Sequence, residues 1–506
     1  MLPARHLPAR ALHDRRVASA QACSPAKQAR RAGPCLRGEN KMIQLFGQHI
    51  SPRNALFIIG EGILIFLAVA LASFFLLGEG IGIVSILEMI WLKALLVSII
   101  TQLSLYFNDL YEFKTTDNAI DLASRLIQSI GITSITLAII YFLWPHMIIG
   151  RWIFFASLIF LLLFLVSWRL LYSLVIGRKL FAERAIILGS DELVQDILHG
   201  IDSRKDLSYN ISSLIAYEKN QNTKDQFRGI PVHYGFDNIC NLAEAENAKS
   251  VIVALDEKRG ILPNEELLKC KVRGINIIDG QSFYERITGK LLVEKITPSW
   301  LIFSDGFVKS RISRATKRLV GLVLSTFMLI LFSPLILLVS VAIKLDSRGP
   351  VLFSQERVGE YGKIYTLYKF RSMRADAEKE SGPVWASEND PRITRVGKII
   401  RKLRIDELPQ LWNVFKGDMS FVGPRPERPV FVEKLKKTIP YYNKRFSVKP
   451  GVTGWAQIKY PYGASEEDAL QKLKYDLYYV KNMSIVMDLI VIFHTAKTVL
   501  LGKGSR

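Results

Sequence analysis

Two adjacent carboxylates, Asp406 and Glu407, open a stretch of the chain whose residue types suit phosphoryl transfer. The stretch Ile405–Arg428 reads IDELPQLWNVFKGDMSFVGPRPER. Apolar residues recur at helical spacing after the acid pair, so we expect a short helix with Asp406 at its N-cap, where the helix dipole keeps a carboxylate ionised. The closing turn is stiffened by prolines and presents Arg425. These are the parts of a phosphoryl-transfer site, although a capped surface helix followed by a Pro-rich turn would show the same spacing.

Cations precede the acid pair at two places. Residues 368–373 read YKFRSM and place Lys369 and Arg371 on one side of a predicted strand. Closer to the acids, five cations recur at every third position: Arg392, Arg395, Lys398, Arg401 and Arg404. We predict a turn at residues 394–397, within this series. Arginine holds phosphate oxygens at two points and lysine acts as a point charge, so these residues favour a phosphorylated substrate. The same cations would also suit anionic lipid.

Length and composition indicate a membrane protein of two or three domains. The chain has 506 residues and is 49% hydrophobic, with the apolar residues concentrated in its first third. Lysine and arginine outnumber the acids 67 to 46, which gives a net charge of +21. That charge suits an anionic membrane face and phosphorylated substrates, and no nucleic-acid reader motif accompanies it. The four cysteines lack metal-ligand spacing and indicate free thiols.

The first third divides into an extension and a membrane region. Residues 1–41 are rich in Arg and Ala, and we predict a disordered extension or a misassigned start, with Met42 as the true start. Four later runs are long enough to cross a bilayer: Ala55–Leu77, Ile83–Phe107, Leu126–Trp144 and Trp152–Ile176. The basic residues of the loops place both ends of this region on the cytoplasmic side. Glu61 and Lys93 lie within or near the spans, and we expect them to snorkel from span ends.

From about Ala182, short apolar strands alternate with polar helices. We expect strands at Ala185–Leu188, Ser212–Tyr217, Val251–Leu255 and Ile275–Ile278, and helices at Glu192–His199, Asp237–Asn247 and Glu265–Val272. This alternation predicts a small parallel α/β domain of Rossmann type. Its first turn carries one glycine, Gly189, where a dinucleotide fingerprint has three, so we favour a regulatory or assembly role over nucleotide binding.

A second kind of apolar segment, Leu319–Ile343, is broken in its middle by Ser333 and Pro334. Proline removes a backbone donor and forces the helix to bend. Basic residues flank the segment on both sides, so a helix that crossed the membrane would violate the positive-inside rule. We therefore predict a re-entrant helix, with an ordinary kinked span as the alternative. Two further helices are expected: Ser465–Tyr479, which begins with a cap, and Ile485–Leu500, in the membrane plane or docked.

The chain from about Val308 to Gly504 resembles the bacterial sugar transferase family of polyprenyl-phosphate hexose-1-phosphate transferases. The motifs that carry the resemblance are KFRSM (369–373), RIDELPQLWNVFKGDMSFVGPRP (404–426), KPGVTGWAQ (449–457) and DLYYVKNMS (476–484). The four spans and the Rossmann-like domain resemble the large members, in particular the exopolysaccharide-system undecaprenyl-phosphate glucose phosphotransferase branch. The implied fold is a membrane protein with four transmembrane α-helices, a Rossmann-like α/β domain and a monotopic, mainly α catalytic domain with a re-entrant membrane helix.

We accordingly divide the chain into four parts. They are the extension (1–41), the four-helix transmembrane region (42–180), the Rossmann-like domain (181–305) and the catalytic domain (306–506), whose re-entrant helix covers about 319–343. The resemblance implies a multi-pass protein of the bacterial inner membrane with its catalytic domain in the cytoplasm. Inner-membrane lipid, a second copy of the chain and other polysaccharide-assembly proteins would be its partners, and nucleic acid would not.

The resemblance also implies a reaction. A nucleotide-diphosphate sugar, UDP-glucose or UDP-galactose, would give its sugar-1-phosphate to undecaprenyl phosphate and release UMP, as the first membrane step of exopolysaccharide or capsule synthesis. A catalytically inactive membrane scaffold or sensor for polysaccharide assembly is the alternative.

The resemblance assigns roles to the residues of the acid pair. Asp406 would be the nucleophile that forms a covalent aspartyl-phosphosugar, and Glu407, together with Asp406, would bind Mg²⁺. Arg401 would offset charge on the transferring phosphoryl group. Three further cations are candidates for substrate phosphates, with Arg404 given a supporting contact: Lys369, Arg371 and Arg425.

Overall fold

The structure is a computed structural model of the chain. It describes residues 43–45, 48–50, 52–77, 83–111, 119–177, 182–189, 192–203, 209–217, 226–255, 261–296, 298–304, 306–374, 390–461, 463 and 465–500. The predicted extension, residues 1–41, lies outside the described residues.

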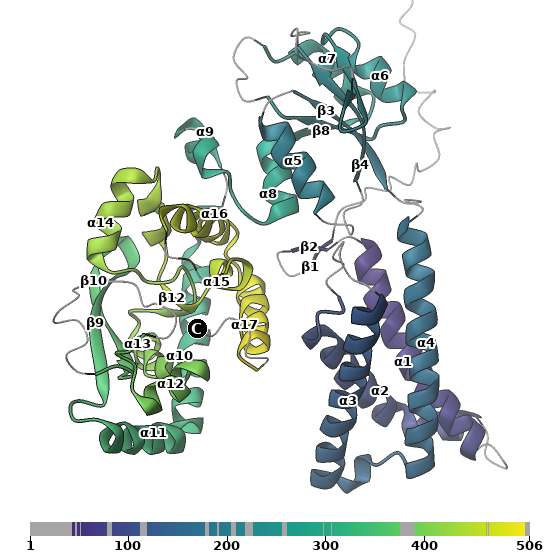
Figure 1. The fold of residues 1–506 in the computed structure, drawn as a ribbon. Coiled ribbons are helices and arrows are strands. Elements are labelled where there is room, and N and C mark those ends of the chain that lie inside the picture. The colour runs from purple at the N-terminus through teal and green to yellow at the C-terminus, as the bar shows by residue number, and fades with distance from the viewer. Residues whose placement is uncertain are drawn as a thin grey trace, which may run out of the picture. The chain divides into compact units, whose positions relative to one another are not determined.

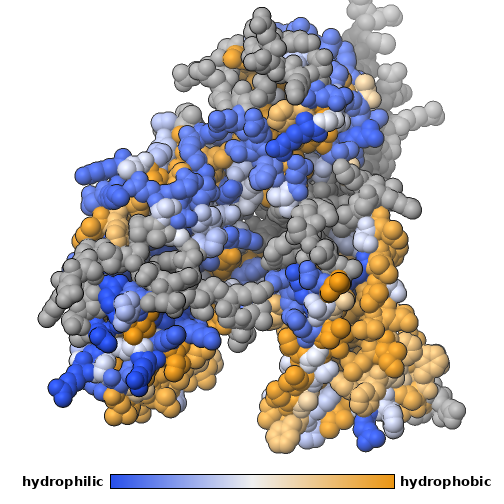
Figure 2. Space-filling model, in the orientation of Figure 1, coloured by the Kyte–Doolittle hydropathy of each residue, from blue (hydrophilic) through white to orange (hydrophobic). Residues whose placement is uncertain are grey.

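Four long helices form the N-terminal bundle (Figure 1). They are α1 (Pro52–Leu77), α2 (Ile83–Phe107), α3 (Ala119–Leu143) and α4 (Arg151–Gly177), preceded by the strands β1 (Ile43–Leu45) and β2 (Gln48–Ile50) and interrupted by the 3-10 turn η1 (Pro145–Met147). Each helix is long and apolar enough to cross a membrane. Figure 2 shows apolar side chains gathered over these helices. The four predicted apolar helices are confirmed, although α3 begins at Ala119 rather than at Leu126.

An ion pair lies inside this bundle, between α1 and α4. Glu61 is fully buried, and its Oε1 accepts a hydrogen bond of 2.8 Å from Nη2 of Arg169. Arg169 also donates to the carbonyl of Leu110 at 3.0 Å. The prediction that Glu61 snorkels is therefore wrong, because its charge is neutralised within the bundle. Lys93 keeps its amine at an exposed position, where it donates to the carbonyl of Ile148.

A six-stranded, mostly parallel sheet forms the α/β region. The strand order is β5-β6-β4-β3-β7-β8, and only β5 runs antiparallel to its neighbour. The strands are β3 (Glu183–Leu188), β4 (Tyr209–Ala216), β5 (Gln226–Phe227), β6 (Ile230–Tyr234), β7 (Ser250–Val253) and β8 (Asn276–Asp279). One face is covered by α5 (Glu192–Asp202) and α8 (Gly280–Thr288), and the other by α6 (Ile239–Ala245) and α7 (Asn264–Val272).

The predicted alternation of strands and helices is confirmed, whereas the β5–β6 hairpin was missed because its strands are short and mixed in polarity. The Rossmann-type assignment stays a prediction. The single glycine of the first turn, Gly189, has a φ of 136°, and a Cβ there would lie 2.3 Å from the carbonyl oxygen of Ala254. Gly189 is therefore needed for close packing of β3 against the chain after β7.

The broken apolar segment forms two helices, α10 (Arg311–Leu331) and α11 (Ser333–Asp346), which are bent by 60° at Phe332. The predicted break at Ser333 and Pro334 is confirmed, because Pro334 lies in the first turn of α11. Most apolar side chains of the pair are exposed, including Phe327, Ile330 and Leu338. Figure 2 shows apolar residues gathered at the end of the C-terminal region where α11 lies.

The remaining elements build a compact, mainly helical unit around the bent pair. They are η2 (Val293–Lys295), α9 (Pro298–Phe303), β9 (Leu352–Val358), η3 (Glu360–Gly362), β10 (Ile364–Phe370), α12 (Arg395–Lys402), η4 (Ile405–Glu407), α13 (Gln410–Lys416), β11 (Ser420–Val422), α14 (Pro429–Thr438), η5 (Tyr442–Ser447), β12 (Gly451–Thr453), α15 (Trp455–Lys459), α16 (Glu466–Asn482) and α17 (Ile485–Leu500). The predicted cap of α16 is confirmed, since Ser465 and Asp468 form a capping box. The turn predicted at residues 394–397 is wrong, because Thr394 is the N-cap of α12.

The buried ion pair of the bundle yields a prediction. Arg169→Met leaves Glu61 charged without its partner, so we expect the free energy of unfolding to fall by about 3–5 kcal/mol. The double variant Glu61→Leu, Arg169→Met should recover most of this loss, because no unpaired charge remains. Thermal unfolding of the purified protein in detergent measures both effects. Arg151→Met, at an exposed arginine of α4, is the control, and equal losses in the single and double variants would contradict the argument.

Candidate active site

The acid pair lies in a 3-10 turn of its own, η4, between α12 and α13. The N-cap of η4 is Arg404, whose φ of 58° is left-handed, and α13 has Pro409 at its N-cap. The prediction that Asp406 caps the helix is therefore wrong. Pro409 has no backbone N–H, and the chain turns sharply at Arg404 before the helix begins.

Two cations from different segments form ion pairs with the same oxygen of Glu407. Nζ of Lys369, on β10, lies 2.8 Å from Oε1, and Nη2 of Arg425, in the turn after β11, lies 3.0 Å from the same atom. Burial alone would raise the pKa of Glu407, but the charges of Lys369 and Arg425 outweigh it and hold that pKa well below its ordinary value. Glu407 is therefore ionised at neutral pH.

The neighbouring carboxylate, Asp406, has a different environment. It is 9% exposed, and within the described residues it makes no hydrogen bond or ion pair. Burial raises the pKa of Asp406 above its ordinary value, and Glu407 raises it further, against the opposing charges of Lys369 and Arg401. Asp406 therefore gains no direct stabilisation of its charge from the dipole of α13, because that helix begins only at Gln410. The site instead contains two adjacent carboxylates whose pKa values are pushed apart, which is typical of groups with separate chemical roles.

The other predicted residues divide between the site and its support. Arg401 and Arg404 lie close enough for their charges to lower the pKa of Asp406. Arg371 is 5% exposed, and its guanidinium donates to the carbonyls of Ser347 and Arg348 after α11. Its observed contacts therefore hold the loop after the bent pair, and its role in phosphate binding stays a prediction.

Sequence reasoning missed Asn413, which joins α13 to β10. Asn413 is fully buried, its Oδ1 accepts from the backbone N–H of Tyr368 at 3.1 Å, and its Nδ2 donates to the carbonyl of Thr366 at 2.7 Å. Because Lys369 follows Tyr368 directly, these bonds fix the strand that presents Lys369 to Glu407. The available signal was an amide side chain inside the otherwise apolar run of residues 411–415.

The far end of α13 was missed as well. Nη1 and Nη2 of Arg318, on α10, donate to the carbonyls of Val414 and Phe415 at 2.6 and 2.7 Å. Lys449 donates to the carbonyl of Gly417 at 2.6 Å. Cations are favourable at a helix C-terminus, so these contacts tie the first helix of the bent pair to the helix that follows the acids.

The acid pair also fits a magnesium ion. No group of three or more His, Cys, Asp or Glu side chains that could hold a metal occurs in the described part of the chain. Mg²⁺ is usually held by one or two carboxylates, with phosphates and water completing its octahedron. The unpartnered Asp406 and the second oxygen of Glu407 provide such ligands.

The bonds of Asn413 yield a prediction. Asn413→Ala removes the partner of the Tyr368 N–H and of the Thr366 carbonyl, both on β10, so we expect the free energy of unfolding to fall by about 1–3 kcal/mol. Denaturant titration of the purified protein in detergent is the measurement. Asn443→Ala, at an exposed asparagine in η5, should change stability by less than about 0.5 kcal/mol. Equal effects of the two substitutions would contradict the assigned role.

Comparison with known proteins bears on two regions. Residues 312–502 match the family model described as bacterial sugar transferase. Residues 106–277 match a model described as a CoA-binding domain.

Three relatives are informative. An N-acetylgalactosaminephosphotransferase of Aeromonas hydrophila, named for UDP-N-acetylgalactosamine and undecaprenyl phosphate, is 42% identical over 47% of this chain and 56% of its own length. An undecaprenyl-phosphate glucose phosphotransferase of Komagataeibacter xylinus is 42% identical over 37% of this chain and 36% of its own. The exopolysaccharide production protein PSS of Rhizobium leguminosarum bv. phaseoli is 44% identical over 37% of this chain and 97% of its own. The match thus spans about half or less of the first two relatives but nearly all of the third, and the chain belongs to the bacterial sugar transferase family.

Proposed function

We propose that this protein transfers a sugar-1-phosphate from a UDP-sugar to undecaprenyl phosphate and releases UMP. One observation carries the proposal. A buried Asp406, which makes no hydrogen bond or ion pair with any described residue, lies beside Glu407, which Lys369 and Arg425 hold ionised. The first carboxylate is suited to attack, because desolvation and a raised pKa make it a stronger nucleophile. The second is suited to bind a cation.

In the first step, a carboxylate oxygen of Asp406 attacks the phosphorus that bears the sugar. The bond from this phosphorus to the oxygen of the nucleoside monophosphate breaks, and UMP leaves with the electron pair. The product is an acyl phosphate of Asp406 that carries the sugar. The attack needs no general base, because the nucleophile is already a carboxylate.

In the second step, an oxygen of undecaprenyl phosphate attacks the same phosphorus. The bond from Asp406 to phosphorus breaks, which restores the carboxylate and leaves the sugar on undecaprenyl diphosphate. Lys369, Arg425 and Arg401 offset the negative charge of the phosphates in both steps. The carboxylates of Glu407 and Asp406 would hold Mg²⁺, which supplies electrostatic stabilisation of the diphosphate.

The bent helix pair would place this chemistry at the membrane surface. The start of α10 is attached to α13 through Arg318, and Val339 and Ile343 of α11 pack with Phe370 and Ile400 in one core. Both ends of the pair therefore join the same unit, which supports the proposed re-entrant helix. With basic residues on both flanks, the catalytic unit would lie on the cytoplasmic face of the bacterial inner membrane.

The sugar is the open part of the proposal. The names of the relatives include glucose, galactose and N-acetylgalactosamine, so they do not favour the predicted glucose or galactose over an acetylated sugar. An inactive scaffold would need neither the unpartnered Asp406 nor the cations around Glu407, so the geometry favours an enzyme.

The first test of the proposal is a transfer assay. Membranes containing the protein are supplied with undecaprenyl phosphate, Mg²⁺ and each of a panel of UDP-sugars that includes UDP-N-acetylgalactosamine, and UMP release is measured. We expect release with one sugar or a few, and a loss of at least about 10⁴-fold in Asp406→Asn, since an amide cannot form the acyl phosphate. The variant should remain folded in the membrane.

Two outcomes would overturn the proposal. Full activity of Asp406→Asn would remove Asp406 as nucleophile. No release with any nucleotide sugar would favour the scaffold. Asp468→Asn, at a carboxylate that caps α16, is the matched control for the substitution itself.

Re-entry yields a further prediction. Cysteines introduced at the exposed positions Val308 and Lys363 should both react with a membrane-impermeant maleimide from the cytoplasmic side only, because both lie outside the bent pair. Pro334→Ala restores a backbone donor and favours a straight helix, so a fraction of the cysteine at position 363 should become accessible from the opposite side. Labelling of the two cysteines from opposite sides without Pro334→Ala would contradict re-entry. Unchanged labelling in Pro334→Ala would contradict the role of the proline.

A further inference from the structure

A buried ion pair lies behind the turn that carries Arg425. Asp476, on α16, is 2% exposed, and its Oδ2 accepts a hydrogen bond of 2.8 Å from Nη2 of Arg445, which is 6% exposed. Asp476 opens the DLYYVKNMS motif, to which the proposed reaction gives no role. Neither residue contacts Glu407 directly in the described structure.

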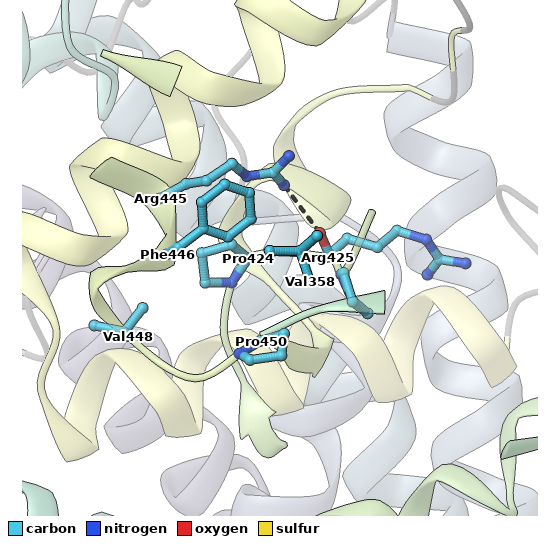
Figure 3. Close-up of a pocket in the computed structure, with 8 residues that line it drawn as sticks. Val358, Pro424, Arg425, Arg445, Phe446, Val448 and Pro450 are labelled. Atoms are coloured by element: carbon cyan, nitrogen blue, oxygen red, sulfur yellow. Dashed lines mark hydrogen bonds between the residues drawn. The ribbon is translucent and has the colours of Figure 1, made fainter. Parts of the chain in front are cut away.

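Arg445 links this pair to the turn. Nη2 of Arg445 also donates to the backbone carbonyl of Arg425 at 2.9 Å, and Nη1 donates to the hydroxyl of Tyr442 at 2.5 Å. Figure 3 shows the bond from Arg445 to the carbonyl of Arg425, while the guanidinium of Arg425 points the other way. The guanidinium carbon of Arg445 lies 5.9 Å from the ring centroid of Phe446. The planar group is therefore fixed by three polar contacts and two aromatic rings.

The turn depends on such a side-chain donor. Arg425 stands between Pro424 and Pro426, and neither proline has a backbone N–H. Backbone hydrogen bonds hold the turn on both sides of Arg425. Gly423 donates to the carbonyl of Thr453 at 2.9 Å, and the carbonyls of Pro424 and Glu427 accept from the N–H groups of Gly451 and Val358, each at 3.0 Å. The carbonyl of Arg425 itself accepts a hydrogen bond from the side chain of Arg445. Together with these backbone bonds, the contact from Arg445 on the opposite side of the backbone fixes the direction in which the guanidinium of Arg425 leaves the turn toward Glu407.

The ion pair is poorly explained by stability alone. Burial raises the pKa of Asp476 to about 6, against the opposing charge of Arg445, so the carboxylate is held in an unfavourable environment. Apolar residues of similar size are often as stabilising as a buried ion pair. What an apolar pair could not provide is a directed hydrogen bond to the carbonyl of Arg425.

We propose that Arg445 and Asp476 are positioning residues for Arg425: Asp476 orients Arg445, and Arg445 fixes the turn that delivers the Arg425 guanidinium to Glu407. This inference rests on the proposed function for its kinetic consequences, whereas its structural consequence does not depend on that function.

The test is a double-mutant cycle on the full chain in detergent. Asp476→Asn should raise the KM for the UDP-sugar or lower kcat/KM by about tenfold, with the KM for undecaprenyl phosphate unchanged. In an Arg425→Ala background, Asp476→Asn should change kcat/KM by less than about twofold, because the residue that it positions is already gone. Arg445→Lys keeps a charged donor and should retain more activity than Arg445→Met.

Glu294→Gln is the matched control. Nζ of Lys474, a buried cation of α16, lies 2.6 Å from a carboxylate oxygen of Glu294. This variant should keep its kinetic constants within about twofold of the unsubstituted protein. Equal losses from Asp476→Asn with and without Arg425 would show a merely structural role and overturn the proposal.

Hydrogen exchange of the backbone amides around the turn tests the positioning role independently of activity. Asp476→Asn should speed exchange at Gly423 and Arg425, and Glu294→Gln should not. Faster exchange would support the positioning role even if no sugar were transferred, in which case only the proposed function would fail. Unchanged exchange at both amides would overturn the positioning role.

Discussion

The arrangement of the segments around the site depends on the need of Asp406 and Glu407 for nearby positive charge. Two carboxylates adjacent in sequence and largely buried repel one another, so at least one of them needs cations nearby to remain ionised. Lys369 and Arg425 meet this need by converging on a single oxygen of Glu407. These residues come from a strand, a 3-10 turn and a Pro-rich turn, and each needs its own structural support.

Helix α13 is the element to which that support is anchored. Its side chain Asn413 holds β10, and its C-terminal carbonyls are capped by Arg318 and Lys449. On the other side of the site, Arg445 holds the turn of Arg425. Buried polar contacts of this kind are costly when incomplete, which makes the relative placement of the three segments specific.

The same helix connects the acid pair to the apolar segment of the C-terminal unit. Gly321 of α10 faces Val414 of α13, and half of the apolar side chains beyond that point of α10 are exposed. Exposed apolar side chains on two helices bent by 60° are typical of a surface that contacts a membrane or another protein. Because Arg318 lies at the start of this segment and caps α13, its contact links the apolar segment to the helix that follows the acids.

The sequence by itself determined the features that depend on neighbouring residues. Apolar run length predicted α1 to α4, alternation predicted β3, β4, β7 and β8, Ser465 predicted the start of α16, and Pro334 predicted the bend. The motif around Asp406 and Glu407 located the site. Only the tertiary structure decided which carboxylate is clamped and which is unpartnered, that Glu61 is paired with Arg169, and that Arg371 supports a loop. The reason is physical: periodicity and capping act over a few residues, whereas burial and ion pairing depend on segments that are distant along the chain and meet only in the fold.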